Sequence, residues 1–263
     1  MNTVVAAGSI FTALMFYAGA MFISAFYGYF RLQAFAIGLS FTEIALKSLQ
    51  LITMPVLLGM TLAVIAPRIP QLLASLRLPD QVVRRAGQTG RAIARHHLLV
   101  VLAGMCLMGL WPFIQPYGWT APLVAAGGML LGLTRPGEQR AWQRGVSIAM
   151  AALLLVWAVG MSASQQGRRV AERTAEQLVG RTAVVILSTE RLSMSGTPGP
   201  LVEDLGKDQH YRYRYSQLRL LVERGKRYYL LPLGWRHRTD PTYVIDDDDS
   251  LRIELYPGTQ PPR

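Results

Sequence analysis

Long apolar runs separated by short polar segments fill the first 163 residues of the chain. No charged residue precedes Arg31. A helix needs about 20 consecutive apolar residues to cross a bilayer. The pattern predicts about five transmembrane helices, at about residues 4–27, 45–66, 98–114, 120–134 and 146–163. The expected fold of residues 1–163 is therefore an α-helical transmembrane bundle.

Local signals refine three of these helices. Ser40 and Glu43 have the spacing of a capping box, which predicts that the second helix begins near Phe41. Pro55 removes a hydrogen bond from the middle of that helix and should kink it. The third and fourth runs are joined by a short turn and should form a hairpin, and Gly128 with Gly132 gives the fourth run a face suited to close helix contact.

The pattern changes after Ser164, where the charged residues become frequent. A helix is expected at 168–179, followed by a β-branched strand at 182–187. Tyr and Arg alternate at 211–215, the period of a strand. Residues 218–231 read as a hairpin with its turn at 224–227, and a second hairpin is expected at 242–255.

These signals predict that residues 164–263 form a soluble, mainly β C-terminal domain. Residues 180–256 should be mostly antiparallel. Tyr211, Tyr213 and Tyr215 should share one face of a strand, since side chains two apart point the same way.

Composition supports the division into a membrane part and a soluble part. Hydrophobic residues make up 51% of the 263 residues and charged residues only 16%. Residues 1–163 hold 11 Lys and Arg with three Asp and Glu, against 16 and 13 in residues 164–263. The net charge of +11 does not favour nucleic-acid binding, because the basic residues of the first part lie in loops between apolar runs.

The expected partners are the lipid bilayer and, for the C-terminal domain, other proteins. One basic loop should contact anionic lipid headgroups. Its arginines are Arg68, Arg77, Arg84, Arg85, Arg91 and Arg95. Short loops rich in arginine stay cytoplasmic. This loop and the basic loop at 135–144 therefore predict a multi-pass protein of a bacterial cell membrane, with a cytoplasmic N-terminus and an extracytoplasmic C-terminal domain.

Few residues carry candidate chemistry, and each has a structural alternative. Glu43 and Lys47 could form an ion or proton relay, although their spacing also suits a surface ion pair at a helix start. Tyr211 and Tyr213 could stack on a base or sugar, or simply pack. Asp246 and Asp248 belong to an acidic run that could bind a divalent ion weakly, but the run lacks the calcium-loop spacing and more simply suits a solvated turn.

Other sites are not predicted. Cys106 lies among apolar residues and is expected to be a small buried hydrophobe. His96 and His97 lack an acidic or thiol partner nearby in sequence, so they are interpreted as interfacial histidines. No catalytic, cofactor-binding or metal-binding residue is predicted, and no cofactor is expected.

Three segments carry a family resemblance. Residues 215–218, 220–223 and 228–232 resemble the core strands of the YcxB-like group, small bacterial domains attached to membrane spans. The resemblance implies a fold like that of pleckstrin-homology domains and a cytoplasmic position after two spans. It implies no activity.

The sequence favours a non-enzymatic membrane anchor or sensor that presents a small β interaction domain. A small transporter or channel-like protein is the first alternative, with Glu43 and Lys47 near its path. A membrane-embedded enzyme is the second alternative. Nucleotide-binding, zinc-protease and serine-hydrolase fingerprints do not occur in the sequence.

Overall fold

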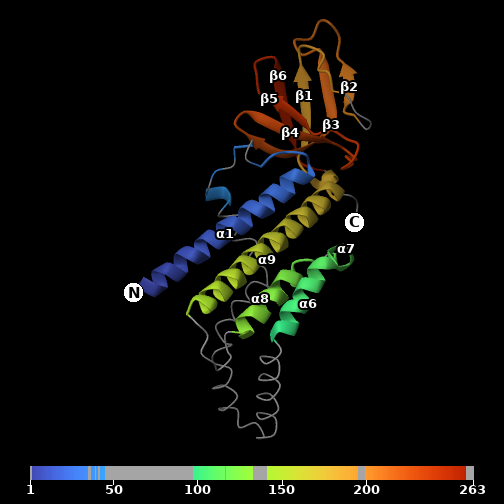
Figure 1. The fold of residues 1–263 in the computed structure, drawn as a ribbon. Helices are drawn as coiled ribbons and strands as arrows, with labels where there is room; N and C mark the ends of the chain where they lie inside the picture. The colour runs from blue at the N-terminus through green and yellow to red at the C-terminus, as the bar shows by residue number, and fades with distance from the viewer. Residues whose placement is uncertain are drawn as a thin grey trace, which may run out of the picture. The chain divides into compact units, whose positions relative to one another are not determined.

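The computed structural model describes residues 2–34, 37–38, 40, 42–44, 97–115, 117–132, 141–194 and 199–258 (Figure 1). The chain forms two compact units. One comprises Met1–Phe22 and Phe41–Gln165, and the other comprises Ile23–Ser40 and Gln166–Arg263. They are called the helical unit and the sheet unit below.

In the part of the chain that the structure describes, two helices are long and apolar enough to cross a membrane. Helix α1 spans Asn2–Tyr29, and helix α9 spans Ala141–Glu176. Their candidate membrane segments are Gly8–Tyr29 and Trp142–Glu176, judged by length and composition. Only 24% and 22% of the apolar windows in these segments are buried, whereas the central helix of a soluble protein would be mostly buried. Most of each apolar window is therefore not buried within the protein.

The prediction of about five spans is wrong. Among the described residues only α1 and α9 reach a spanning length. Helices α6 (His97–Gly109) and α8 (Thr120–Gly132) have 13 residues each, about 20 Å of helix against the roughly 30 Å of a hydrocarbon core. The third predicted run breaks after Gly109, because Pro112 has no backbone N–H to continue the helix, and a short helix α7 (Trp111–Ile114) follows. The predicted span at 45–66 lies outside the described residues.

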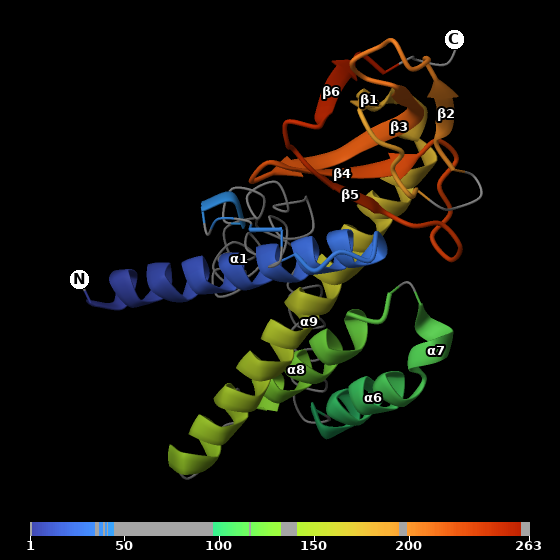
Figure 2. The same ribbon diagram turned by 90° about the horizontal axis from the view of Figure 1, so that it is seen from above.

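The predicted hairpin of the third and fourth runs is confirmed in the helical unit. Helices α6 and α8 lie side by side in both ribbon views (Figures 1 and 2). A Cβ added at Gly128 would lie 2.8 Å from the backbone nitrogen of Val101, and one at Gly104 would lie 2.6 Å from the backbone nitrogen of Ala125. Glycine thus permits contact between the two backbones, as the small-residue pattern predicted at Gly128.

Helix α9 combines two segments that were predicted as separate helices. The fifth apolar run and the helix expected at 168–179 form one helix of 36 residues. It ends at Glu176, and a short 3-10 turn, η2 (Leu178–Gly180), leads into the sheet. Polar residues after Ser164 change the surface of the helix but do not interrupt it, because none of them is a strong helix breaker.

The C-terminal region is an antiparallel sheet, as predicted. Its strands are β1 (Ala183–Ser188), β2 (Leu201–Asp204), β3 (Tyr213–Arg224), β4 (Arg227–Pro232), β5 (Tyr243–Asp246) and β6 (Leu251–Tyr256). The strand order is β5-β4-β3-β1-β6, and β2 pairs with the first part of β3 (Figure 1). Strand β2 is an element that the sequence pattern did not predict.

Strand β3 has 12 residues and pairs with three neighbours, β1, β2 and β4. Its pairing register shifts at two points. Its register with β1 shifts between Val184 and Ile186, where Gln217 has a φ of 63°, and its register with β4 shifts between Leu220 and Val222. Bulges of this kind insert one extra residue and increase the twist of a strand.

A cluster of buried side chains from β1, β3, β4 and β5 forms the core of the sheet unit. It comprises Val184, Ile186, Tyr215, Leu218, Leu230 and Tyr243.

The second predicted hairpin is wrong. Strand β5 pairs with β4, and β6 pairs with β1, so the two strands take different edges of the sheet. The acidic run between them is a connection across the unit. The physical reason is long-range pairing: a local hairpin would leave the outer edge of β1 unpaired, whereas β6 forms a six-residue ladder with it.

Candidate functional site

Helix α1 ends in a sharply defined C-terminal cap inside the sheet unit. The amide of Leu32 donates to the carbonyl of Tyr27 at 3.0 Å, and the amide of Arg31 donates to the carbonyl of Gly28 at 3.1 Å. Arg31 has a φ of 62°. Together these features form a Schellman motif, in which the left-handed position is usually occupied by glycine. Here an arginine occupies it.

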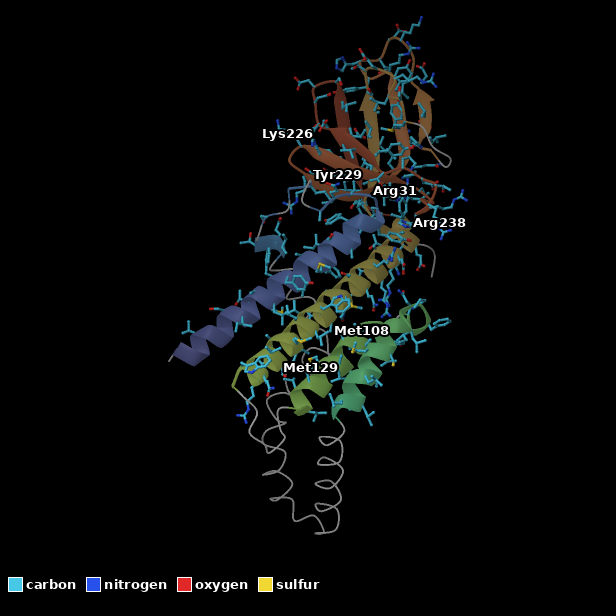
Figure 3. The ribbon with its side chains drawn as sticks, in the orientation of Figure 1. Arg31, Met108, Met129, Lys226, Tyr229 and Arg238 are labelled. Atoms are coloured by element: carbon cyan, nitrogen blue, oxygen red, sulfur yellow. The ribbon has the colours of Figure 1, made fainter. Side chains whose placement is uncertain are left out.

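The loop between β4 and β5 binds this helix end. The guanidinium of Arg31 donates to the carbonyls of His237 and Arg238, at 3.2 and 2.7 Å. The hydroxyl of Thr242 donates to the carbonyl of Phe30 at 2.8 Å. These contacts join residues 29–31 to residues 233–242, a region called the junction below. Figure 3 shows Arg31 and Arg238 near each other at the end of α1.

The cap pairs the carbonyls of Tyr27 and Gly28, and the junction provides partners for the next two carbonyls, those of Tyr29 and Phe30. The carbonyl of Phe30 accepts from Thr242, and the carbonyl of Tyr29 lies 2.7 Å from Nδ1 of His237. Since a carbonyl can only accept, His237 carries its proton on Nδ1 in this contact. The loop thus satisfies helix-end groups that would otherwise require water.

Aromatic rings fill the space between these hydrogen bonds. The ring of Tyr29 stacks on His237 with a centroid distance of 4.1 Å and an interplanar angle of 10°. Phe30 is fully buried, and its ring centroid lies 5.2 Å from that of Trp235. The indole N–H of Trp235 donates to the carbonyl of Pro241 at 3.2 Å. The junction therefore combines apolar burial with directional bonds.

A buried carboxylate stabilises the conformation of the β4–β5 loop. Asp240 is 1% exposed, and it accepts from the amide of Arg236 and from the hydroxyl of Thr239, each at 2.7 Å. Its oxygens are turned toward the loop backbone. The side chains of Arg236 and Arg238 are exposed. Among the described residues neither arginine forms an ion pair.

A second feature is an open groove of about 340 Å³ at the β3–β4 turn. Gly225 and Lys226 both have positive φ, 53° and 62°, which is the geometry of a two-residue hairpin turn. This confirms the first predicted hairpin. Arg227 Nε donates to Asp246 Oδ1 at 2.6 Å along one wall. Figure 3 labels Lys226 and Tyr229, two of its lining residues. Paired charges make this groove less suited to capture an ion than the junction.

The predicted acidic positions have local roles. Asp246 is the ion-pair partner of Arg227. Asp248 accepts from the amide and hydroxyl of Ser250, at 2.9 and 2.5 Å. The hydroxyl contact is the main reason that the pKa of Asp248 is lowered. Among the described residues no group of three or more His, Cys, Asp and Glu could hold a metal ion.

The predicted tyrosine stripe is mainly structural. Tyr215 is fully buried in the core cluster, and Tyr213 packs against that cluster. The Tyr215 hydroxyl accepts from the amide of Leu192 at 2.6 Å. Tyr211 precedes β3, and its ring contacts that of His210 edge to face. Tyr213 and Tyr215 thus share a packed face, and the intervening arginine, Arg214, pairs with Glu203.

The remaining predicted positions lie in the N-terminal half. Ser40 is outside a helix and residues 42–44 are helical, in agreement with a helix start near Phe41, and Glu43 is half-buried. Lys47 and the six arginines of the basic loop at 68–95 lie outside the described residues. Cys106 is exposed on α6, so the described part of the protein does not bury it, and its predicted burial would have to come from lipid.

The junction was not predicted from the sequence. Two signals could have indicated it: Arg31 directly follows an aromatic-rich helix end, and an aromatic residue and three basic residues occur together at 235–238. Neither signal shows that the two segments meet, because 206 positions separate Arg31 from His237.

Comparison with known proteins adds no relative from which a function could be transferred. Any inference about function therefore depends on the junction and on the two long apolar helices. No protein-family model matches the chain, and neither a curated protein nor a solved structure matches it significantly.

Proposed function

We propose that this chain is a membrane-anchored, non-enzymatic interaction protein whose C-terminal β domain is held at the membrane surface to bind other proteins. The observation that carries the proposal is the junction, where the end of a potential membrane helix is bonded directly to the β domain. A domain tethered by a flexible linker would not need such contacts.

The connection after α9 adds to this support. Arg219 is buried, and its Nε donates to the carbonyl of Leu178 at 3.2 Å. Arg181 donates to the carbonyl of Leu221 at 3.3 Å. Burial lowers the pKa of both arginines, but an arginine stays charged at physiological pH. The sheet is thereby bonded to the turn that follows α9 as well as to the end of α1.

The sheet offers an edge for partner binding. Among the described residues β6 pairs with β1 alone, and Leu255 and Tyr256 are 48% and 47% exposed. An edge strand with free backbone groups can add a strand from a partner. The resemblance to YcxB-like domains implies a pleckstrin-homology-like fold, which agrees with an interaction role. The proposal keeps this fold and not the cytoplasmic position that the resemblance also implies.

The proposed orientation follows from the two helix ends. The C-terminal ends of α1 and α9 both belong to the sheet unit. If each helix crosses the membrane once, the N-terminus of the chain and the β domain lie on opposite sides. The basic loops predicted at 68–95 and 135–144 favour a cytoplasmic N-terminus and hence an extracytoplasmic β domain.

The interaction role can be tested in native membranes. A photoreactive amino acid at Leu255 should give a discrete cross-linked protein product in membranes that have been washed at alkaline pH. The same amino acid at Lys207, an exposed residue of the β2–β3 turn, is the matched control. Loss of the chain from washed membranes would refute the anchor. Equal products at both positions, or none at Leu255, would refute binding at the β6 edge.

A further inference from the structure

The junction leaves a cluster of positive charge at its surface. Arg31, Arg236 and Arg238 are all exposed, and the carbonyl contact of Arg31 places its guanidinium at 2.7 Å from the backbone of Arg238. The carboxylate in the loop, Asp240, is buried and accepts from Arg236 N and the Thr239 hydroxyl, and it forms no ion pair with these guanidinium groups. The cluster is thus positive without a paired anion among the described residues.

The place of this cluster restricts its partner. Tyr29 is the last residue of both α1 and its candidate membrane segment, and Arg31 follows two positions later. Tyrosine and tryptophan favour the membrane–water interface. Tyr29 and Trp235 meet here, with ring centroids 5.9 Å apart. If α1 crosses a bilayer, the arginines of the junction are at the level of the lipid phosphates.

Charges on α9 also face this region. Arg168, Glu172 and Glu176 are each close enough to act electrostatically on the hydroxyl of Tyr29. Arg168 and Glu172 are four residues apart on the helix, a spacing at which opposite charges attract. Arg168 and the three junction arginines give four positive charges, against three negative charges from Glu172, Glu176 and Asp240, so positive charge is in excess by one.

We propose that Arg236 and Arg238, supported by Arg31, bind the phosphate of an anionic membrane lipid at the end of α1. This inference rests on the proposed membrane anchoring. Guanidinium groups suit phosphate because they can donate two parallel hydrogen bonds to its oxygens. An anionic lipid is preferred over a zwitterionic one because positive charges outnumber negative charges in this region, so a ligand with a net negative charge is attracted more strongly.

The test uses the full-length chain purified in detergent and titrated with phosphatidylglycerol or phosphatidylcholine, with bound lipid counted by native mass spectrometry. The wild-type chain should bind phosphatidylglycerol more tightly. Arg236→Gln with Arg238→Gln should weaken phosphatidylglycerol binding by about tenfold to thirtyfold, from the typical contribution of two basic residues at a membrane surface.

Two controls make the result specific. Lys207→Gln with Arg252→Gln removes the same charge from the β2–β3 turn and β6, and should leave the affinity unchanged. Arg236→Lys with Arg238→Lys keeps the charge and should retain most of the binding. If the lysine variant loses binding as fully as the glutamine variant, the loss reflects loop structure and the proposal fails.

Other outcomes would also overturn the inference. Equal binding of the two lipids would remove the anionic preference, and displacement by millimolar inorganic phosphate would indicate a site for free phosphate. An unchanged affinity in the glutamine variant would place any lipid site elsewhere. Membrane extraction of the same wild-type chain separates these results from failure of the proposed function: a chain that stays in washed membranes but lacks lipid preference refutes only the lipid site.

Discussion

At the scale of single residues, Arg31 combines an unfavourable backbone conformation with hydrogen bonds to residues distant in sequence. A non-glycine residue with positive φ costs on the order of 1 kcal/mol. Hydrogen bonds from a charged group are worth about 1.5–3 kcal/mol when well shielded, and less at an exposed site such as this one. The two carbonyl contacts in the junction can therefore offset the strain of the helix cap.

Substitutions at Arg31 should separate these two effects. Arg31→Ala keeps the strained conformation and loses both hydrogen bonds, so it should be the least stable form. Arg31→Gly loses the bonds but removes the strain, and should be about 1 kcal/mol more stable than Arg31→Ala. Thermal unfolding of the full chain in detergent measures the order. An alanine variant as stable as the glycine variant would contradict the left-handed cap.

The ion pair between Arg212 and Asp204 makes a prediction about pH. Hydrogen bonding from the Arg212 guanidinium, at 2.9 Å, is the main reason that the pKa of Asp204 is lowered. A carboxylate whose pKa falls on folding stabilises the fold above its unfolded pKa of about 3.9, and that contribution is lost as the pH falls through the folded value. The pair should therefore matter at neutral pH and disappear in acid.

Arg212→Gln should raise the pKa of Asp204 toward its ordinary value, because the bond that lowers it most is lost. The measurement is an NMR titration of the carboxyl carbon of Asp204 in selectively labelled protein. Asp248 is the internal control, because its lowered pKa depends first on Ser250. A parallel rise at Asp248, or no rise at Asp204, would contradict a specific effect of Arg212.

At the scale of elements, the α6–α8 hairpin depends on glycine at two contact points. Neighbouring glycines of α8 have opposite environments: an added Cβ at Gly128 would contact the backbone of Val101, whereas one at Gly127 would have no atom within 4 Å. The contact at Gly128 cannot relax by rotating a side chain, because the nearest atoms include backbone.

This difference gives a matched pair of substitutions. Gly128→Ala should lower the thermal stability of the full chain, because the two helices must move apart. Gly127→Ala should leave it unchanged or raise it, since alanine is favoured over glycine in a helix by about 1 kcal/mol. Circular dichroism during heating in detergent measures both. Equal effects of the two substitutions would refute the close contact between α6 and α8.

At the scale of the whole molecule, the proposed orientation is open to direct measurement. In a Cys106→Ala background, single cysteines are introduced at Asn2 and Ser250 and labelled in intact cells with a membrane-impermeant thiol reagent. Ser250→Cys should be labelled and Asn2→Cys should not, until the cells are opened. Labelling of both positions from one side would refute opposite placement. The reverse pattern would move the β domain to the cytoplasm.

The sequence by itself determined the features that depend on neighbouring residues. Apolar composition marked α1 and α9 as candidate membrane helices, and small residues marked the helix contact at Gly128. Alternation and the Arg-Gly-Lys-Arg turn marked β3 and its hairpin with β4. These properties are local, since side-chain period, turn geometry and helix capping act over a few positions.

Tertiary structure decided which distant segments meet. The local sequence pattern predicted that β5 and β6 form a hairpin. In the structure β5 pairs with β4 and β6 pairs with β1, at opposite edges of the sheet. The apolar pattern also predicted that α6 and α8 are spans, although each has only 13 residues. The junction is the strongest case: Arg31 and the loop at 233–242 become a site only because the end of α1 has unsatisfied carbonyls and the folded sheet brings donors to them.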